Sequence, residues 1–170
     1  LFAFYLVKGD LVTARDLAEQ CLRLAEDVRD VALLIEAHRM LCNIFHFMGE
    51  PTAVVRHADS ALALYDRHQH RTLAFLFGQD PAVVCHSFAA MNLRVLGYSA
   101  QAIERNQAAV NYARELAHAN SLGLALAFAS TLYGFMRNWT ETLAFAEEAI
   151  ALAHEQRLVF WGTIGALNRG

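Results

Sequence analysis

The sequence has little proline and glycine, and it lacks any strand-like alternation of apolar and polar residues. Only two prolines and nine glycines occur among 170 residues. No run of Val, Ile or Thr alternates with polar residues as a half-buried strand requires. With 56% hydrophobic and 18% charged residues, the composition also differs from that of disordered proteins. These absences predict a folded, all-α protein.

A concentration of charge of one sign is lacking as well. The 14 basic and 17 acidic residues are scattered along the chain and give a formal net charge of -3, so no basic stripe is available to neutralise a nucleic-acid backbone. Cys21, Cys42 and Cys85 are widely spaced in apolar helical patterns and form no Cys-x-x-Cys pair. We expect no nucleic-acid partner, and we interpret the cysteines as small core residues in a reducing cytoplasm.

Targeting and membrane signals are weak. The chain begins at Leu1 without a basic and apolar leader, and it ends at Gly170 within a helical pattern, which predicts a fragment of a longer polypeptide. The 18 residues from Ala119 to Met136 carry no formal charge and reach the lower limit for a membrane span. Internal polar residues and the lack of flanking Lys/Arg clusters favour buried helices instead. We expect a cytoplasmic protein with no membrane partner.

Catalytic and metal-binding signatures are absent. No Gly-rich phosphate loop, His-Glu-x-x-His run, EF-hand loop or nucleophile elbow occurs. His57, His68 and His70 offer imidazoles, but no cysteine or carboxylate completes a four-ligand set at a suitable spacing, so a polar loop is the favoured interpretation of 68–70. We expect no enzyme activity, no cofactor and no metal.

What the chain does contain is an internal repeat. Four copies carry mostly small residues at 5, 9, 12 and 15 positions after an anchor residue, and these steps lie on one helix face. Small side chains there allow a neighbouring helix to approach closely. The anchors are 40, 48 and 40 residues apart, so the period is 40 with one insertion of eight. The copies are Gly9 with Ala14, Ala18, Cys21 and Leu24; Gly49 with Val54, Ala58, Ala61 and Leu64; Gly97 with Ala102, Asn106, Ala109 and Tyr112; and Arg137 with Thr142, Ala146, Ala149 and Leu152.

Each anchor predicts a turn between two helices. Glycine tolerates the left-handed conformation that ends a helix, and Asp10, Ser99 and Asn138 are suited to cap the helix that follows. Pro51 suits a first helical turn. Because Arg137 replaces glycine in the fourth copy, we expect that turn to be built differently.

Further helices precede the anchors. Apolar residues at steps of three and four predict helices over 30–48, 81–96 and 120–136. The first eight residues continue a truncated helix, and 158–169 begin a fifth pair. The expectation is nine helical segments, with partial ones at both ends.

The repeat resembles the tetratricopeptide family. Gly49, Val54, Ala58 and Ala61 stand where that family places its turn glycine and small packing residues, and the resemblance extends over nearly the whole chain. The period of 40 exceeds the usual 34. The resemblance implies a right-handed superhelix of antiparallel helix-turn-helix repeats, a TPR-like α-α solenoid. We assign one domain, 1–170, with repeats at about 1–29, 30–67, 81–118 and 119–156, a partial repeat at 157–170 and an insertion at 68–80.

The insertion carries a second resemblance. The segments 70–75 and 78–81 look like part of the helical arm of large bacterial signalling proteins, which join a cyclase or kinase domain to an AAA-like ATPase. This implies that such chemistry lies outside these residues. The expected function is a protein-protein interaction scaffold or regulatory arm. The alternative is a small-ligand sensor arm coupled to an ATPase or cyclase domain.

The first helices of stacked pairs line a concave surface where extended protein or peptide partners bind. On the helix over 30–48, the polar residues follow one face at steps of three, four and three. They predict either a solvated face or a groove for an acidic or polar peptide, with Arg39 and Arg94 flanking an anion-accepting site. A sensor would instead need an enclosed cavity where Ser87, Arg94 and Thr131 converge. The candidate partner-binding residues are Glu36, Arg39, Asn43, His46, Ser87, Met91, Arg94 and Thr131.

A stack cut between repeats leaves apolar packing faces at its two ends. Phe2, Phe4 and Tyr5 mark one end, and Phe160 and Trp161 mark the other. These residues predict a homo-oligomer formed through uncapped terminal helices.

Overall fold

The computed structural model describes all residues from 1 to 170 and contains helices and turns without strands. The nine helical segments expected from the sequence are present, and two further short helices, α5 and α6, form at the predicted insertion. A polar loop was predicted only for 68–70, which belong to α5. The helices are α1 (Phe2–Lys8), α2 (Leu11–Val28), α3 (Val31–Met48), α4 (Pro51–Leu64), α5 (Arg67–His70), α6 (Leu73–Phe77), α7 (Pro81–Val95), α8 (Ser99–Leu116), α9 (Ala119–Phe135), α10 (Trp139–Gln156) and α11 (Val159–Arg169).

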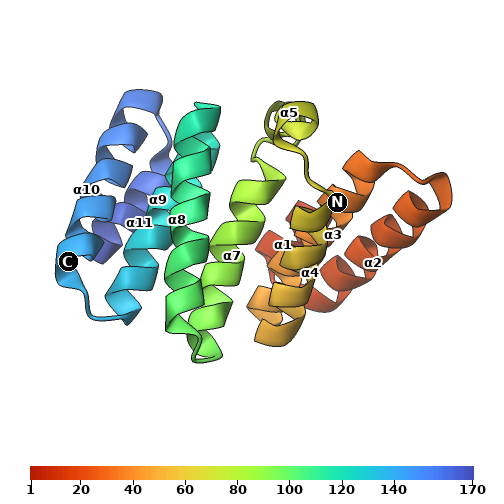
Figure 1. Ribbon diagram of the computed structural model, residues 1–170, viewed down its shortest axis with the longest axis horizontal. Helices are drawn as coiled ribbons and strands as arrows, with labels where there is room; N and C mark the ends of the chain where they lie inside the picture. Colours follow the sequence, from red (N-terminus) through yellow and green to blue (C-terminus); the bar gives the residue numbers. More distant parts are fainter.

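The long helices form two layers along the long axis of the molecule (Figure 1). Helices α3, α7, α9 and α11 each contact the next in that series, and together with α1 they make the inner layer. Helices α2, α4, α8 and α10 make the outer layer, and each packs against the inner helices that precede and follow it in the chain. This arrangement leaves one face of the inner layer free to form a site.

The repeated small residues explain the close packing between layers. Ala14, Ala58, Ala102 and Ala146, one from each copy, are fully inaccessible to solvent, so each lets a neighbouring helix approach its backbone. Burial varies at the last repeated position, 15 residues after the anchor, where Leu24 of α2 is 59% exposed. The small residues therefore mark the packed face of each helix, but the last position of the pattern can lie outside the core.

The cysteines follow the expected pattern only in part. Cys42 and Cys85 are buried, as expected of core residues, whereas Cys21 lies exposed on α2. The interpretation of Cys21 as a core residue was wrong because the outer face of α2 has no neighbouring helix beyond it.

The four turns share one backbone conformation. Gly9, Gly49 and Gly97 have φ of 82°, 76° and 91°, and Arg137 takes the same left-handed conformation at 58°. The expectation of a differently built fourth turn was therefore wrong, and a side chain bears a conformation that glycine adopts without strain.

The helix starts agree with the sequence at three of four predicted positions. Asp10 and Asn138 accept hydrogen bonds from the backbone N–H of Thr13 and Glu141, and Pro51 begins α4. Ser99 does not cap α8, because it is already the first helical residue and no side chain caps that helix.

On length and composition alone, α3 is the one helix apolar enough to cross a membrane. Core helices pass the same test, and α3 packs against α2, α4 and α7 with Ile35, Leu41 and Ile44 almost inaccessible. The uncharged stretch singled out in the sequence corresponds to α9, which lies between α7, α8, α10 and α11.

The apolar terminal residues are divided between packed and free positions. Phe2 and Tyr5 pack against the core cluster of α2 and α3, and Trp161 is only 7% exposed. Phe4 and Phe160 remain 62% and 66% exposed. Self-association through the ends stays a prediction, and the residues available for it are Phe4 and Phe160.

Candidate functional site

A groove of about 850 Å³ lies on the inner layer and is lined mostly by residues of α1, α3, α7, α9 and α11, with Leu11 at the start of α2 and two turn residues completing it. Ten of its fifteen lining residues are hydrophobic. None of the lining residues carries a formal charge. We call it the inner groove. Its residues are Leu6, Val7, Gly9, Leu11, Asn43, His46, Phe47, Gln79, Phe88, Asn120, Leu124, Phe128, Phe160, Trp161 and Ile164.

Aromatic rings from successive inner helices form the floor of this groove. The Phe88 ring of α7 lies 4.7 Å from the Phe128 ring of α9 and 6.3 Å from the Phe47 ring of α3, measured between centroids. Phe88 is 5% exposed, whereas Phe47 is 54% exposed. Phe88 is therefore a buried part of the floor, and Phe47 exposes apolar surface in the groove.

The far wall of the groove is fixed by Trp161 of α11. Its indole Nε1 donates to Asn120 Oδ1 at 2.5 Å, and the Asn120 amide donates to the Gly78 carbonyl at 2.6 Å. Gly123 allows this approach, since a Cβ there would come within 2.7 Å of the Trp161 ring. Helix α11 is thus tied through α9 to the turn that ends the insertion.

His46 lines the inner groove and also a second groove next to it. The Asn92 amide donates to His46 Nδ1 at 2.9 Å, which leaves the imidazole proton on Nε2. Burial lowers the pKa of His46. At neutral pH the ring is therefore uncharged and carries one N–H donor on Nε2.

The second groove, which we call the Arg94 groove, has a volume of about 570 Å³. Arg94 forms no ion pair, and it is the one formal charge among the residues lining the two grooves. The Thr131 hydroxyl donates to the Ala127 carbonyl and accepts from the Asn168 amide. The lining residues are His46, Met91, Arg94, Val95, Thr131 and Phe135.

The structure brings together four of the eight predicted partner-binding residues. His46, Met91, Arg94 and Thr131 line the Arg94 groove, and Asn43 lines the inner groove together with His46. These residues therefore lie together on the inner layer, and their part in partner binding stays a prediction.

Glu36 and Arg39 do not face a groove. Their side chains are each 12% exposed and form an ion pair, with Arg39 Nε donating to Glu36 Oε2 at 2.7 Å. Asn43 is 8% exposed, and with its amide turned over it would donate to the Arg39 carbonyl and accept from Arg39 Nη1, both at 3.2 Å. The expectation of a solvated polar face was wrong here, and Arg39 cannot flank an anion site, because Glu36 already satisfies its charge.

Ser87 is likewise misplaced by the sequence prediction. It is 1% exposed, its hydroxyl has no hydrogen-bond partner, and it lines neither groove. It precedes the groove-lining Met91 by one turn of α7 and lies close to the same helix face, but neighbouring residues cover it.

Sequence reasoning missed a buried polar network at the end of the insertion. The Tyr65 hydroxyl lies 2.5 Å from Asp80 Oδ2, to which it donates, and 2.9 Å from the Tyr112 hydroxyl. Asp80 Oδ1 accepts from the backbone N–H of Ala82 and Val83 and so caps α7. The Asp-Pro pair was a signal for this cap, but no sequence pattern points to the two tyrosines.

Asp80 is fully inaccessible to solvent. Burial raises the pKa of its carboxyl, and the hydrogen bonds from Tyr65 and from the backbone of α7 act in the opposite direction. The Asp80 backbone N–H donates to Ser121 Oγ at 2.8 Å, and Ser121 Oγ lies 2.9 Å from His118 Nδ1. The network thus joins α4, the insertion, α7, α8 and α9.

The histidines considered as metal ligands in the sequence lie apart. His57 Nδ1 is 3.0 Å from His38 Nδ1, whereas His70 Nδ1 accepts from the Asp66 backbone N–H at 2.9 Å. His68 belongs to α5, which replaces the loop expected at 68–70. No three His, Cys, Asp or Glu side chains are grouped closely enough to hold a metal ion.

No protein-family model matches the chain, and no curated protein matches it. The chemistry of the site is therefore inferred from the residues that line the grooves. The aromatic floor suits apolar side chains. The Nε2–H of His46 suits a hydrogen-bond acceptor, and the unpaired guanidinium of Arg94 suits an anion.

Proposed function

We propose that this chain is a tetratricopeptide-like helical solenoid that binds a peptide segment of a partner protein along the inner layer. The observation that supports it most is the apolar groove that continues across all five inner helices. A groove of this length suits an extended or helical peptide, which uses successive side chains as anchors. The repeated small residues and left-handed turns support the solenoid assignment.

The charges of the site define the chemistry of the partner. The inner groove is uncharged, and its neighbour carries Arg94 with no carboxylate paired to it. A peptide with aromatic or aliphatic side chains followed by an acidic residue complements both grooves at once. His46, which borders both, would donate from Nε2 to a peptide carbonyl.

We further propose that the chain serves as a scaffold or regulatory arm of a cytoplasmic signalling protein and acts by binding rather than catalysis. The resemblance of the insertion to a segment of such arms supports this context. The sensor alternative requires Ser87, Arg94 and Thr131 to converge in an enclosed cavity. Ser87 instead lies in the core away from both grooves, so the geometry favours the scaffold.

Selection from a random peptide display library tests the peptide-binding proposal. We expect the selected peptides to be enriched in aromatic or aliphatic residues followed by Asp or Glu. Replacing Phe47 or Phe160 with Ser should weaken their binding by about tenfold or more, since exposed aromatic anchors contribute most to such interfaces. Fluorescence anisotropy with a labelled selected peptide measures the loss.

Matched exposed residues outside the grooves provide the controls. Phe75→Ser removes an aromatic ring that is 72% exposed on α6, and it should leave the affinity unchanged. Arg94→Glu should lower the affinity for acidic peptides, whereas Arg56→Glu on α4 should leave that affinity unchanged. Equal effects of Phe47→Ser and Phe75→Ser, or a selection without shared sequence features, would refute peptide binding in the groove.

A further inference from the structure

The polar side chains of the inner groove are mostly engaged within the protein. The Asn120 amide is bonded on both sides, its oxygen at 2.5 Å and its nitrogen at 2.6 Å from protein partners. Asn43 is 8% exposed, and His46 Nδ1 accepts from the Asn92 amide. The polar side-chain groups that remain for a ligand are therefore the Nε2–H of His46 and the amide of Gln79.

The backbone of the groove floor is engaged as well. Phe88, Leu124 and Phe128 lie inside α7 and α9, where each backbone N–H and C=O is bonded along its own helix. The protein contains no strand, so no sheet edge is present to pair with an added chain. The floor thus offers a ligand apolar contacts and very few hydrogen bonds.

An extended peptide would lose hydrogen bonds in such a groove. Each of its residues brings one backbone N–H and one C=O, and a buried group of this kind without a partner costs free energy comparable to a lost hydrogen bond. Five extended residues bring about ten such groups, against the free side chains of His46 and Gln79. An α-helix pairs its own backbone groups along most of its length, so it can place an apolar face on the floor without this cost.

The free groups beside the inner groove are hydrogen-bond donors. His46 borders both grooves, and Arg94 lines the Arg94 groove without a carboxylate partner. A guanidinium and an imidazole N–H donate hydrogen bonds and accept none. The C-terminal end of a helix complements them, because its last four carbonyls have no partner in the helix and carry the negative end of the helix dipole.

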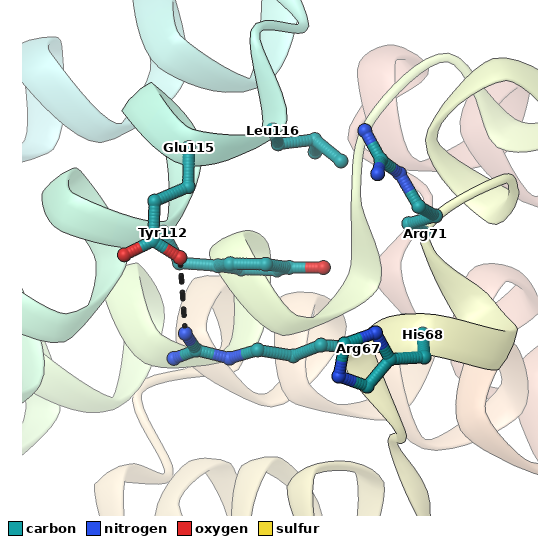
Figure 2. Close-up of a pocket in the computed structure, with 6 residues that line it drawn as sticks. All are labelled: Arg67, His68, Arg71, Tyr112, Glu115 and Leu116. Atoms are coloured by element: carbon teal, nitrogen blue, oxygen red, sulfur yellow. Dashed lines mark hydrogen bonds and ion pairs between the residues drawn. The ribbon is translucent and has the colours of Figure 1, made fainter.

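The pocket between α5 and the C-terminal end of α8 holds two other cations, Arg67 and Arg71 (Figure 2). The Arg67 guanidinium carbon lies 4.4 Å from the centre of the Tyr112 ring, and its Nη1 is 3.2 Å from Glu115 Oε2, so this cation is already paired. Arg71 lies on the opposite face of the ring and forms no ion pair. Because it lines neither groove, Arg71 is a matched control for Arg94.

We propose that the peptide bound in the inner groove is an amphipathic α-helix whose C-terminal end lies over His46 and Arg94, an assignment that rests on the proposed peptide-binding function. Apolar anchors at positions i, i+3 or i+4, and i+7 share one face of such a helix and contact the exposed rings of Phe47 and Phe160. An acidic residue one turn beyond the last anchor pairs with Arg94.

Two peptide display libraries test the conformation. In one, the random positions follow one face of a helix rich in Ala, Glu and Lys, and in the other a proline at every fourth position prevents helix formation. We expect binders from the helical library alone. In the best binder, Pro at a central position on the outer face should lower the affinity about tenfold or more, whereas Ala at the same position should leave it unchanged. Fluorescence anisotropy with labelled peptides measures both affinities.

Variants of the protein test the place and the direction of the bound helix. Phe47→Ser should lower the affinity of the helical binder about tenfold, and Phe75→Ser should leave it unchanged. Arg94→Ala should lower the affinity about fivefold for a binder with Asp at its C-terminal end, and it should not affect a version with that Asp moved to the N-terminal end. Arg71→Ala should affect neither version.

The outcomes distinguish a helical partner from peptide binding in general. Binders from the proline library that depend on Phe47, or a helical binder that tolerates the central proline, would overturn the helical conformation and leave peptide binding in the groove standing. Equal losses for the two Asp versions with Arg94→Ala would overturn the direction. If neither library yields a binder, peptide binding and the helical partner fail together.

Discussion

Acidification from about pH 7 to about pH 4.5 is expected to lower the free energy of unfolding by on the order of 3 kcal/mol. The cause is two half-buried histidines whose pKa burial lowers, so that they are uncharged at neutral pH. Burial lowers the pKa of His57 from 6.5 to about 4, with the charges of His38 and Arg56 adding to the effect. Burial, Arg105 and Arg67 lower the pKa of His86 from 6.5 to about 4.

The sign follows from proton uptake. Between the unfolded pKa of 6.5 and the folded pKa of about 4, the unfolded chain binds protons that the folded chain does not. Stability is therefore fully present above pH 6.5 and is lost as the pH falls through this window. Each tenfold change in proton affinity corresponds to about 1.4 kcal/mol, and we roughly halve the sum for the two rings because they are partly exposed.

The contact between His38 and His57 gives the mechanism for one of these rings. Their Nδ1 atoms are 3.0 Å apart, so one must carry a proton and the other must accept it. Protonating both rings places two cations against each other between α3 and α4. Protonation of Asp80 opposes this loss of stability at low pH. Burial raises the pKa of its carboxyl, so the folded chain takes up that proton at a higher pH than the unfolded chain does.

Chemical denaturation at a series of pH values measures the effect. The double variant His57→Gln and His86→Gln should flatten the dependence between about pH 6.5 and 4.5, whereas His68→Gln on the exposed α5 should not change it. Equal unfolding free energies of the wild type at both ends of this range would contradict the prediction.

The helical layout could be predicted because it depends on local signals. The steps from Gly9, Gly49 and Gly97 define the packed faces, and the helices predicted over 30–48, 81–96 and 120–136 begin and end within one residue of α3, α7 and α9. Arg137 shows the limit of local reasoning. Its left-handed conformation is imposed by the helices on both sides, which overrides its intrinsic preference.

The candidate site could be predicted only in part, because a helix face does not reveal what packs on it. Met91 and Arg94, which helical register assigns to the inner face, line a groove in the structure. Glu36 and Arg39 share an equivalent pattern, yet they pair with each other away from both grooves. Which polar residues pair depends on side-chain contacts that periodicity does not encode.

The Tyr65, Asp80 and Tyr112 network lay beyond sequence reasoning for a related reason. Its hydroxyl-hydroxyl contact joins residues 47 positions apart, across an insertion that breaks the repeat. Only the cap formed by Asp80 is local, and only that part has a sequence signature. The network is nevertheless the main polar connection between the insertion and the long helices.

Asp80→Ala is expected to lower the free energy of unfolding by about 3 kcal/mol, because it removes the α7 cap and leaves the Tyr65 hydroxyl without its acceptor. Asp30→Ala is the matched control, since Asp30 caps α3 through the Leu33 N–H but is exposed, and it should cost only about 1 kcal/mol. Asp80→Asn keeps an acceptor for the cap and should cost less than Asp80→Ala. Urea denaturation compares the variants, and equal losses for Asp80→Ala and Asp30→Ala would show that the network adds nothing to the cap.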